Sequence, residues 1–262
     1  MTNALSRPKL WLIRLALGSE TRLLQPFQGL DWARAIQKYE SPGFAYPDYY
    51  RRNYHGLEGG YLSPLAAITY DPITAKILVP GEMRVRRAFV KHVSGILGDT
   101  SPRQILELAT GTGSTTMLWR RAFAEAEISG IDLSPYMLVA AERKLAGQNV
   151  ALRLGRAEAT GFAANSFDLI VTSLLFHEIP AAVARQVVEE AYRLLKPGGV
   201  LAVLDGNQKS NFMVRTVAGY FPEPYFLEYM NSDLGQMYRQ CGFKNVHSGK
   251  YLGLYQMVTG FK

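Results

Sequence analysis

Cysteine is almost absent from this chain of 262 residues, whose one thiol is Cys241. A single thiol excludes a disulfide framework and a metal site built from several cysteines, so we expect no metal site. No apolar run reaches the roughly 18 residues that a membrane-spanning helix needs. The best candidate, residues 10–17, is interrupted by Arg14 and is interpreted as a first amphipathic helix rather than a signal peptide. We therefore expect a cytoplasmic protein of a reducing compartment.

Acidic residues are outnumbered, with 22 Asp and Glu against 29 Lys and Arg, and the formal net charge is +7. Residues 1–100 carry +5 of this excess and residues 101–262 carry +2. Such a balance is compatible with an anionic substrate, nucleic acid or an anionic membrane surface, although a solvated basic face is the more common explanation. Runs of five or more basic residues are missing, and this argues against nucleic acid.

The second part of the chain, residues 101–262, alternates short apolar runs with helical stretches. Strands are predicted over residues 105–109, 127–132, 167–173 and 200–204, and helices over 113–125, from 134 onward, and over 181–195. This alternation is typical of an α/β fold with a doubly wound, Rossmann-like parallel sheet. A helix over 231–241 precedes two close strands, 243–247 and 252–261, which predict a late antiparallel hairpin.

The first 100 residues have a different pattern. Helices are predicted over 10–17, 32–39 and 81–96, and the segment between the second and third is rich in loops and tyrosines. We therefore predict an N-terminal helical cap over residues 1–100 and a cofactor-binding domain over residues 101–262, with the boundary near Thr100-Ser101-Pro102.

The strongest functional signal is a glycine-rich turn between a strand and a helix. Glu107 lies on the strand, Gly111 and Gly113 form the turn, and Asp132 ends the next strand 19 residues later. The glycines allow positive φ and a close approach of a ligand to the backbone. An acidic residue at the end of the second strand can bind two ribose hydroxyls.

Two cofactors compete for this turn. A nicotinamide dinucleotide requires G-x-G-x-x-G, but Thr116 stands where the third glycine belongs. Glu107 would also repel a pyrophosphate, whereas a carboxylate there suits the ammonium of an amino-acid-bearing cofactor. The pattern therefore favours S-adenosyl-L-methionine.

These motifs resemble those of the class I S-adenosylmethionine-dependent methyltransferases across about 160 residues. The matching segments are Glu107 to Gly113, Gly130 to Leu133, Gly155 to Glu158 with Phe162, Phe167 to Glu178, and Leu194 to Gly199. The resemblance implies a methyltransferase of the Rossmann-like fold that acts on a methyl acceptor.

The resemblance also implies a role for individual residues. Glu107 would bind the methionine end, Gly111 and Gly113 would form the close turn that follows Ala109, and Asp132 would bind the ribose. The adenine and sulfonium contacts would come from Leu133, Met137, Ala157, Glu158 and Ser173. One departure is Arg156, which occupies a position where the family often has an aspartate for the adenine amine; Glu158 or a backbone carbonyl would then substitute.

A further likeness covers Ala66 to Thr74, with Gly81 and Arg84 beyond. It is similar to the stretch that precedes the sheet in the C-methyltransferases of ubiquinone and menaquinone biosynthesis. A tyrosine in that stretch reaches over the cofactor, so the likeness implies this role for Tyr70.

Aromatic residues gather in two places. Residues 39–61 hold seven of them, and a second cluster after the fifth strand comprises Tyr220, Phe221, Tyr225, Phe226 and Tyr229. Ligands of doubly wound sheets bind beyond the carboxyl ends of the strands, where both clusters could form walls. Such walls favour a flat or lipophilic substrate and attract a sulfonium. Packing of the cap alone is an equally good explanation for any single tyrosine.

Two of the four histidines are candidates for a general base. His177 follows the fourth strand near the expected methyl group, and His55 lies in the aromatic segment of the cap. A structural role for His177, a hydrogen bond within its loop, is equally compatible with the sequence.

The interpretation that these observations favour is methyl transfer to a small molecule. After the fourth strand the chain reads Thr172-Ser173-Leu174-Leu175 in place of the motif of base N-methyltransferases, and Glu178 lacks the second glutamate of protein-arginine enzymes. An alternative is a cofactor-binding protein that acts as a cyclase or a regulatory binding module. The acceptor atom (carbon, oxygen or nitrogen), the oligomeric state and a peripheral membrane contact of the basic stretch from Lys9 to Arg22 stay open.

Overall fold

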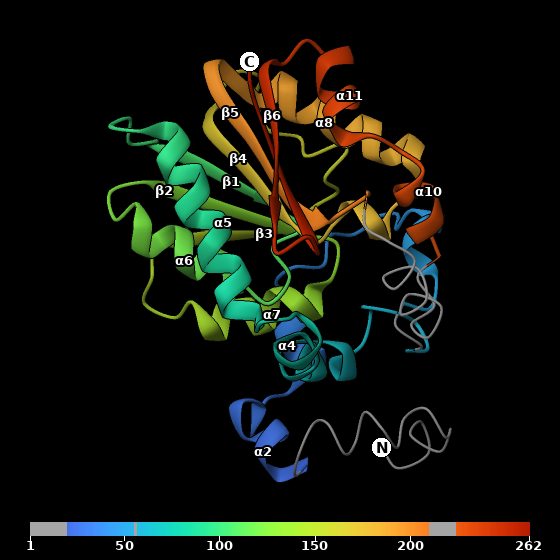
Figure 1. Cartoon of the computed structure of the whole chain (residues 1–262). Helices are drawn as coiled ribbons and strands as arrows, with labels where there is room; N and C mark the ends of the chain where they lie inside the picture. The colour runs from blue at the N-terminus through green and yellow to red at the C-terminus, as the bar shows by residue number, and fades with distance from the viewer. Residues whose placement is uncertain (1–19, 55–56, 210–223) are drawn as a thin grey trace.

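The computed structural model describes residues 20–54, 57–209 and 224–262. The predicted helix over 10–17, His55, and Tyr220 with Phe221 lie outside these described residues. Within them, one seven-stranded sheet carries helices on both faces (Figure 1). The helices are α2 (Glu20–Leu24), η1 (Gln25–Phe27), α3 (Trp32–Ile36), η2 (Asp48–Arg51), α4 (Pro64–Ile77), α5 (Glu82–Leu97), α6 (Ser114–Ala122), α7 (Pro135–Lys144), η3 (Phe176–Glu178), α8 (Ala181–Leu194), α10 (Phe226–Met230) and α11 (Leu234–Gln240).

The sheet has the strand order β3-β2-β1-β4-β5-β7-β6. Its strands are β1 (Gln104–Leu108), β2 (Glu127–Asp132), β3 (Val150–Leu154), β4 (Phe167–Ser173), β5 (Leu195–Gly206), β6 (Lys244–Tyr251) and β7 (Tyr255–Phe261). The first five strands are parallel, and β7 is antiparallel to both β5 and β6. The predicted doubly wound sheet and its late antiparallel hairpin are therefore confirmed. The strand order reverses between β1 and β4, which is where such sheets bind ligands.

Successive residues of the central strands enter two separate hydrophobic cores, as the alternation of side chains along a strand requires. On one face Leu106 and Leu201 pack with α8 and α11. On the other face Ile105 and Ala202 pack with α5 and α6, around the fully buried Trp119. Burial on both faces explains the continuous apolar runs by which the strands were predicted.

Helix α5 belongs to the second of these cores, although it lies within the predicted cap. Val85, Phe89 and Val93 are completely buried and pack with Ile105 and Trp119. The predicted boundary near residue 100 therefore does not separate two hydrophobic cores. Within the described residues, α2, α3 and α4 contribute no side chain to either core, and the loops between them contribute only Tyr49, which packs against the first core.

Several elements were not predicted, among them helix α4 and strand β3. Helix α4 occupies the stretch that appeared loop-rich. Ser63 caps its start by accepting a hydrogen bond from the backbone N–H of Ala66. Pro64 lies in the first turn, where a proline favours the start of a helix. Pro72 lies within this helix, although proline is unfavourable in helix interiors. Strand β3 is the short edge strand and alternates between partly buried and exposed residues, which explains why its apolar signal is weak. Within the described residues, no helix is long and apolar enough to cross a bilayer.

Candidate active site at the carboxyl edge of the sheet

A cavity lies beyond the carboxyl ends of β1 to β4, at the reversal of strand order. Its empty space, part of which is open to solvent, amounts to about 700 Å³. The loops after these strands form its floor, and five tyrosines form the opposite wall. The sequence-predicted cofactor residues that line it are Tyr70, Ala109, Gly111, Asp132, Leu133, Met137, Ala157, Glu158 and Ser173.

The glycine-rich turn after β1 forms one side of the cavity. Ala109, Gly111 and Gly113 all have positive φ, of 53°, 56° and 79°. A Cβ on Gly111 would meet no protein atom within 4 Å, so this side of the backbone is open to a ligand. Gly113 plays a different part: a Cβ there would lie 2.9 Å from Leu145 Cδ1. It allows α6 to begin close to the end of α7 and is not among the described residues that line the cavity.

Asp132 is held at the mouth of the turn by backbone donors. Its Oδ1 accepts the N–H of Ser134 at 2.8 Å and its Oδ2 accepts the N–H of Gly111 at 2.8 Å. Burial raises the pKa of this carboxyl to about 6, an effect that these bonds oppose. A carboxylate has about four acceptor positions, so capacity remains toward the cavity.

Glu107 lies behind the turn rather than on the cavity surface. It is almost completely buried, and Thr116 Oγ1 donates a hydrogen bond to its Oε2 at 2.5 Å. Burial raises the pKa of Glu107 to about 7, while the hydrogen bond from Thr116 and the charge of Arg86 oppose the rise. Thr116, which took the place of a dinucleotide-type glycine in the sequence, thus supports the carboxylate that distinguishes the motif.

Arg86 was missed at the sequence level although it is one of the most constrained side chains of the site. Its guanidinium is buried, with Nε 2.8 Å from Glu82 Oε1 and Nη1 2.5 Å from Thr115 Oγ1 and 2.8 Å from Ser173 Oγ. It therefore joins α5 to the start of α6 and the end of β4. The i, i+4 spacing of Glu82 and Arg86 suggests a surface helix pair in the sequence, and only the packing of α5 on the sheet buries it.

The tyrosine wall consists of Tyr49, Tyr50, Tyr54, Tyr61 and Tyr70. Their rings form a chain of contacts, with centroid distances of 6.3 Å for Tyr50–Tyr54, 5.4 Å for Tyr54–Tyr61 and 6.2 Å for Tyr61–Tyr70. Burial raises the pKa of Tyr50 and of Tyr70, so these hydroxyls stay protonated at neutral pH. Two members of the second predicted aromatic cluster do not join this wall. Phe226 and Tyr229 pack instead in the core on one face of the sheet.

Hydroxyl groups of this wall bridge to the loops that follow the strands. The Tyr49 hydroxyl lies 3.0 Å from both carboxylate oxygens of Glu158. The Tyr61 hydroxyl donates to Glu178 Oε1 at 2.5 Å, and that of Tyr54 donates to the carbonyl of Glu178 at 3.1 Å. The cap segment is thus tied across the cavity to the loops after β3 and β4.

The two histidine candidates have different outcomes. His55 is outside the described residues. The described residues that line the cavity do not include His177, whose Nδ1 lies 2.6 Å from Asp205 Oδ1 at the end of β5. Its Nε2 lies 3.8 Å from Glu178 Oε1, and Glu178 does line the cavity. A buried carboxylate behind a histidine cannot be recognised in the sequence, because 28 residues separate the two.

Comparisons with known proteins agree with this architecture. A family profile described as a methyltransferase domain matches residues 105–199. A ubiquinone/menaquinone biosynthesis C-methyltransferase of Desulfotalea psychrophila is 29% identical over 205 residues, covering 70% of this chain and 81% of that protein. A demethylmenaquinone methyltransferase of Lactiplantibacillus plantarum is 30% identical, covering 76% of this chain and 92% of that protein.

Solved structures share the fold. A phosphoethanolamine N-methyltransferase of Haemonchus contortus in complex with S-adenosyl-L-methionine superimposes with a TM-score of 0.59 at 17% identity, over 76% of this chain and 57% of that one. A SAM-dependent methyltransferase of Aquifex aeolicus gives 0.55 at 19% identity, over 76% and 98%.

The chain belongs to the S-adenosylmethionine-dependent methyltransferases and is related to the C-methyltransferases of quinone biosynthesis. The residues present fit this cofactor. Asp132 offers a buried carboxylate toward the cavity, and the open side of Gly111 leaves room for a ligand against the backbone.

Proposed function

We propose that this methyltransferase acts on a small, flat aromatic or lipophilic acceptor held against the tyrosine wall. The observation that carries the proposal is the continuous chain of ring contacts from Tyr50 to Tyr70 along one side of the cavity. Aromatic faces bind flat apolar ligands well and exclude water, which a methyl transfer requires. The relatives named as quinone-biosynthesis C-methyltransferases support the same substrate class.

The cofactor would lie along the floor of the cavity. Asp132 would bind the ribose hydroxyls, Leu133 and Met137 would pack on the adenine, and Ala157 and Glu158 would border its edge. Ser173 and Tyr70 would lie near the reacting centre. The open turn at Gly111 would hold the amino-acid end, Glu107 would act on it through its charge from behind the turn, and Gly113 would keep α6 close to α7. When bound, S-adenosylmethionine supplies a methyl group on a positively charged sulfur, and the neighbouring tyrosine faces would stabilise that charge.

The role of the cap follows from its hydroxyl contacts. The hydrogen bond from Tyr49 to Glu158 and that from Tyr61 to Glu178 hold the tyrosine wall over the cavity. A closed wall aligns the acceptor with the methyl group and keeps water out. We therefore place the substrate cap at residues 20–77, within the N-terminal region predicted from the sequence.

Glu178 is the group that we propose takes a proton from the acceptor. Its carboxylate lines the cavity, Tyr61 holds one oxygen, and His177 stands 3.8 Å behind it with Asp205 on the far side of the imidazole. His177 is then a positioning residue, which Asp205 orients by the 2.6 Å contact to Nδ1. This arrangement is suited to an acceptor whose O–H or C–H becomes acidic as the bond to the methyl group forms.

The test is a turnover assay of the full chain with methyl-labelled S-adenosylmethionine and a panel of quinols, phenols and amines. We expect S-adenosylhomocysteine and a labelled product with a hydroxylated aromatic acceptor, and mass spectrometry with NMR identifies the methylated atom. Turnover confined to aliphatic amines would contradict the aromatic acceptor. Binding of cofactor without turnover on any acceptor would instead favour the cyclase or regulatory alternative.

A pair of variants tests the proton acceptor. Glu178→Gln keeps the size of the side chain and is expected to lower kcat by about 10²-fold or more while leaving the cofactor Kd unchanged. His177→Asn is expected to lower kcat less and to shift the pH profile, since it acts through Glu178. Equal kcat in wild type and Glu178→Gln would remove Glu178 from this role.

A further inference from the structure

The end of α4 with the loop that leads to α5, and the tip of the β6–β7 hairpin, together expose an unusual set of apolar side chains. Ile77 is 45% exposed, Val79 57% and Leu252 59%. Single exposed apolar residues are ordinary, but these three come from two segments that pack together. The Tyr255 side chain interacts with the backbone of Val79, and Leu78, Met83, Tyr251 and Leu254 pack against one hydrophobic core.

The backbone conformation at the hairpin tip is unfavourable for the leucine that stands there. Leu252 and Gly253 both have positive φ, of 54° and 68°. The left-handed region is unfavourable for a leucine, and asparagine or glycine is the usual residue there. A leucine at this position is also largely exposed, so folding does not explain why an apolar side chain stands at the tip. Tyr251 and Tyr255 flank it with rings 6.5 Å apart.

The exposed charged side chains that neighbour these apolar residues in the sequence are basic. Glu82, the acidic residue of residues 72–91 and 242–262, is buried and paired with Arg86. Lys76, Arg84 and Lys250 are exposed beside the apolar residues in the sequence. Lys209 is a further exposed cation. It follows Asn207 by two residues, and Asn207 is hydrogen bonded to Gly253 and Leu254 of the tip, so Lys209 lies near the tip.

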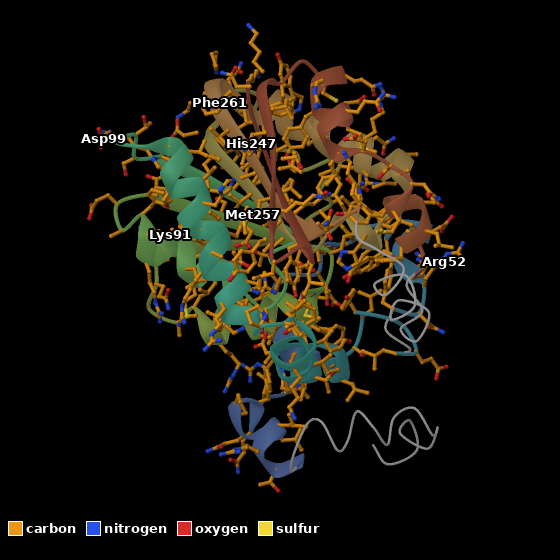
Figure 2. The ribbon with its side chains drawn as sticks, viewed as in Figure 1. Arg52, Lys91, Asp99, His247, Met257 and Phe261 are labelled. Carbon is orange, nitrogen blue, oxygen red and sulfur yellow. The ribbon has the colours of Figure 1, made fainter. Side chains whose placement is uncertain are left out.

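This surface lies at the cavity end of the molecule. β7 is antiparallel to β5, with Tyr255 opposite Gly206, so the hairpin tip lies at the carboxyl edge of the parallel strands. In Figure 2, Asp99 after α5 and Phe261 in β7 mark the opposite end of these elements. Ile77 follows the cavity residue Tyr70 by seven residues of α4, about 10 Å along the helix axis.

We propose that the exposed residues at the end of α4, in the loop to α5 and at the β6–β7 tip form a docking face for an anionic lipid bilayer. Ile77, Val79 and Leu252 would enter the apolar boundary of the bilayer, the partly exposed Tyr251 would lie at the headgroup level, and the four cations would face anionic headgroups. The match of exposed apolar tips with basic and no exposed acidic neighbours in these segments favours this partner over a second protein. The docked face would bring the cavity close to a lipid-dissolved acceptor.

Co-sedimentation of the full chain with vesicles tests this face. Phosphatidylglycerol mixed with phosphatidylcholine is compared with phosphatidylcholine alone, and we expect binding to the anionic vesicles that weakens as salt is added. Arg7, Lys9 and Arg14 also carry charge near the start of the chain, so wild-type binding alone does not locate the face. Equal binding to both vesicle types would overturn the proposal.

Variants of the proposed face, each with a control variant elsewhere on the surface, test where the bilayer binds. Leu252→Asn suits the positive φ and should keep or raise Tm while reducing vesicle binding severalfold, whereas Leu227→Asn removes a 68% exposed leucine of α10 and should leave binding unchanged. Lys250→Glu should weaken binding about fivefold or more. Lys244→Glu, about 20 Å away along the same strand, should have little effect.

Three results contradict the proposal. One is wild-type binding by Leu252→Asn and Lys250→Glu, and another is equal losses in the test and control variants. The third is a dimer that Leu252→Asn dissociates in sedimentation equilibrium, which would assign the face to a second copy of the chain. Methyl transfer to a water-soluble acceptor is measured separately and is expected to be unchanged in Leu252→Asn.

Discussion

Lys144 Nζ lies 2.6 Å from Asp71 Oδ2, and this ion pair joins α7 to α4 across the glycine-rich turn. The same ammonium contacts Ser114 Oγ at 2.7 Å, and Thr112 Oγ1 donates to Asp71 Oδ1 at 2.5 Å. The cap helix that carries Tyr70 is therefore attached to the turn through the residue that follows Tyr70.

Asp71→Asn is expected to weaken cofactor binding more than it weakens the fold. The pair is partly exposed, so its loss should change the free energy of unfolding by about 1 kcal/mol or less. Looser attachment of α4 should raise the cofactor Kd about fivefold, which corresponds to about 1 kcal/mol. Calorimetric titration and urea unfolding measure both. Glu142→Gln breaks the exposed Lys38–Glu142 pair of the same helix and serves as the control, with an unchanged Kd.

Arg86→Met is expected to destabilise the fold strongly. Both partners of the Arg86–Glu82 pair are about 95% buried, and removal of the cation leaves Glu82 as an unpaired buried charge. Breaking a buried pair costs about 3–5 kcal/mol, whereas replacing both partners by apolar residues is often close to neutral. Urea unfolding should therefore show a large loss for Arg86→Met and a partial recovery for Arg86→Met with Glu82→Leu. A double variant no more stable than the single one would contradict this account.

The glycines of the turn should separate folding from binding. Gly113→Ala places a Cβ 2.9 Å from Leu145 in a left-handed conformation, so we expect a loss of about 2 kcal/mol or more of stability. Gly111→Ala meets no protein atom and should cost about 1–2 kcal/mol from its backbone conformation alone. Its larger effect should be on the cofactor Kd. The ratio of binding loss to stability loss, measured by titration and urea unfolding, should be higher for Gly111→Ala.

Stability should fall as pH rises through the acid range. Burial raises the pKa of Glu107 from an ordinary 4.5 to about 7. Between these values the folded chain binds more protons than the unfolded chain, so the free energy of unfolding decreases with rising pH. The cost of ionising Glu107 in the fold is complete above pH 7 and absent below about pH 4.5.

Glu107→Gln removes this titration. Compared with wild type, the variant should gain about 1–3 kcal/mol in relative stability between pH 5 and pH 7.5. Urea unfolding at the two pH values without cofactor measures the change. In wild type the cofactor Kd should decrease from pH 6 to pH 8, because the ionised carboxylate attracts an ammonium group. A stability difference independent of pH would show that Glu107 does not titrate in this range.

Much of the fold could be predicted because its signals are local. Strands β1, β2 and β4 are mostly buried and carry short apolar runs, and Gly111, Gly113 and Asp132 follow a spacing that the turn geometry requires. Helix α4 and strand β3 escaped prediction for opposite reasons. Helix α4 contains Pro72, a residue that is unfavourable inside helices, and the alternation of β3 at the sheet edge lacks a continuous apolar run.

The sequence by itself determined the parallel sheet, the cofactor turn and the class of reaction, because each depends on residues close together in the chain. Only the tertiary structure decided which groups face the acceptor. It directed His177 toward Asp205, placed Glu178 and Tyr61 in the cavity, and buried Arg86 against Ser173. These contacts join residues from 28 to 117 positions apart, and packing of helices on the sheet, rather than any local pattern, brings them together.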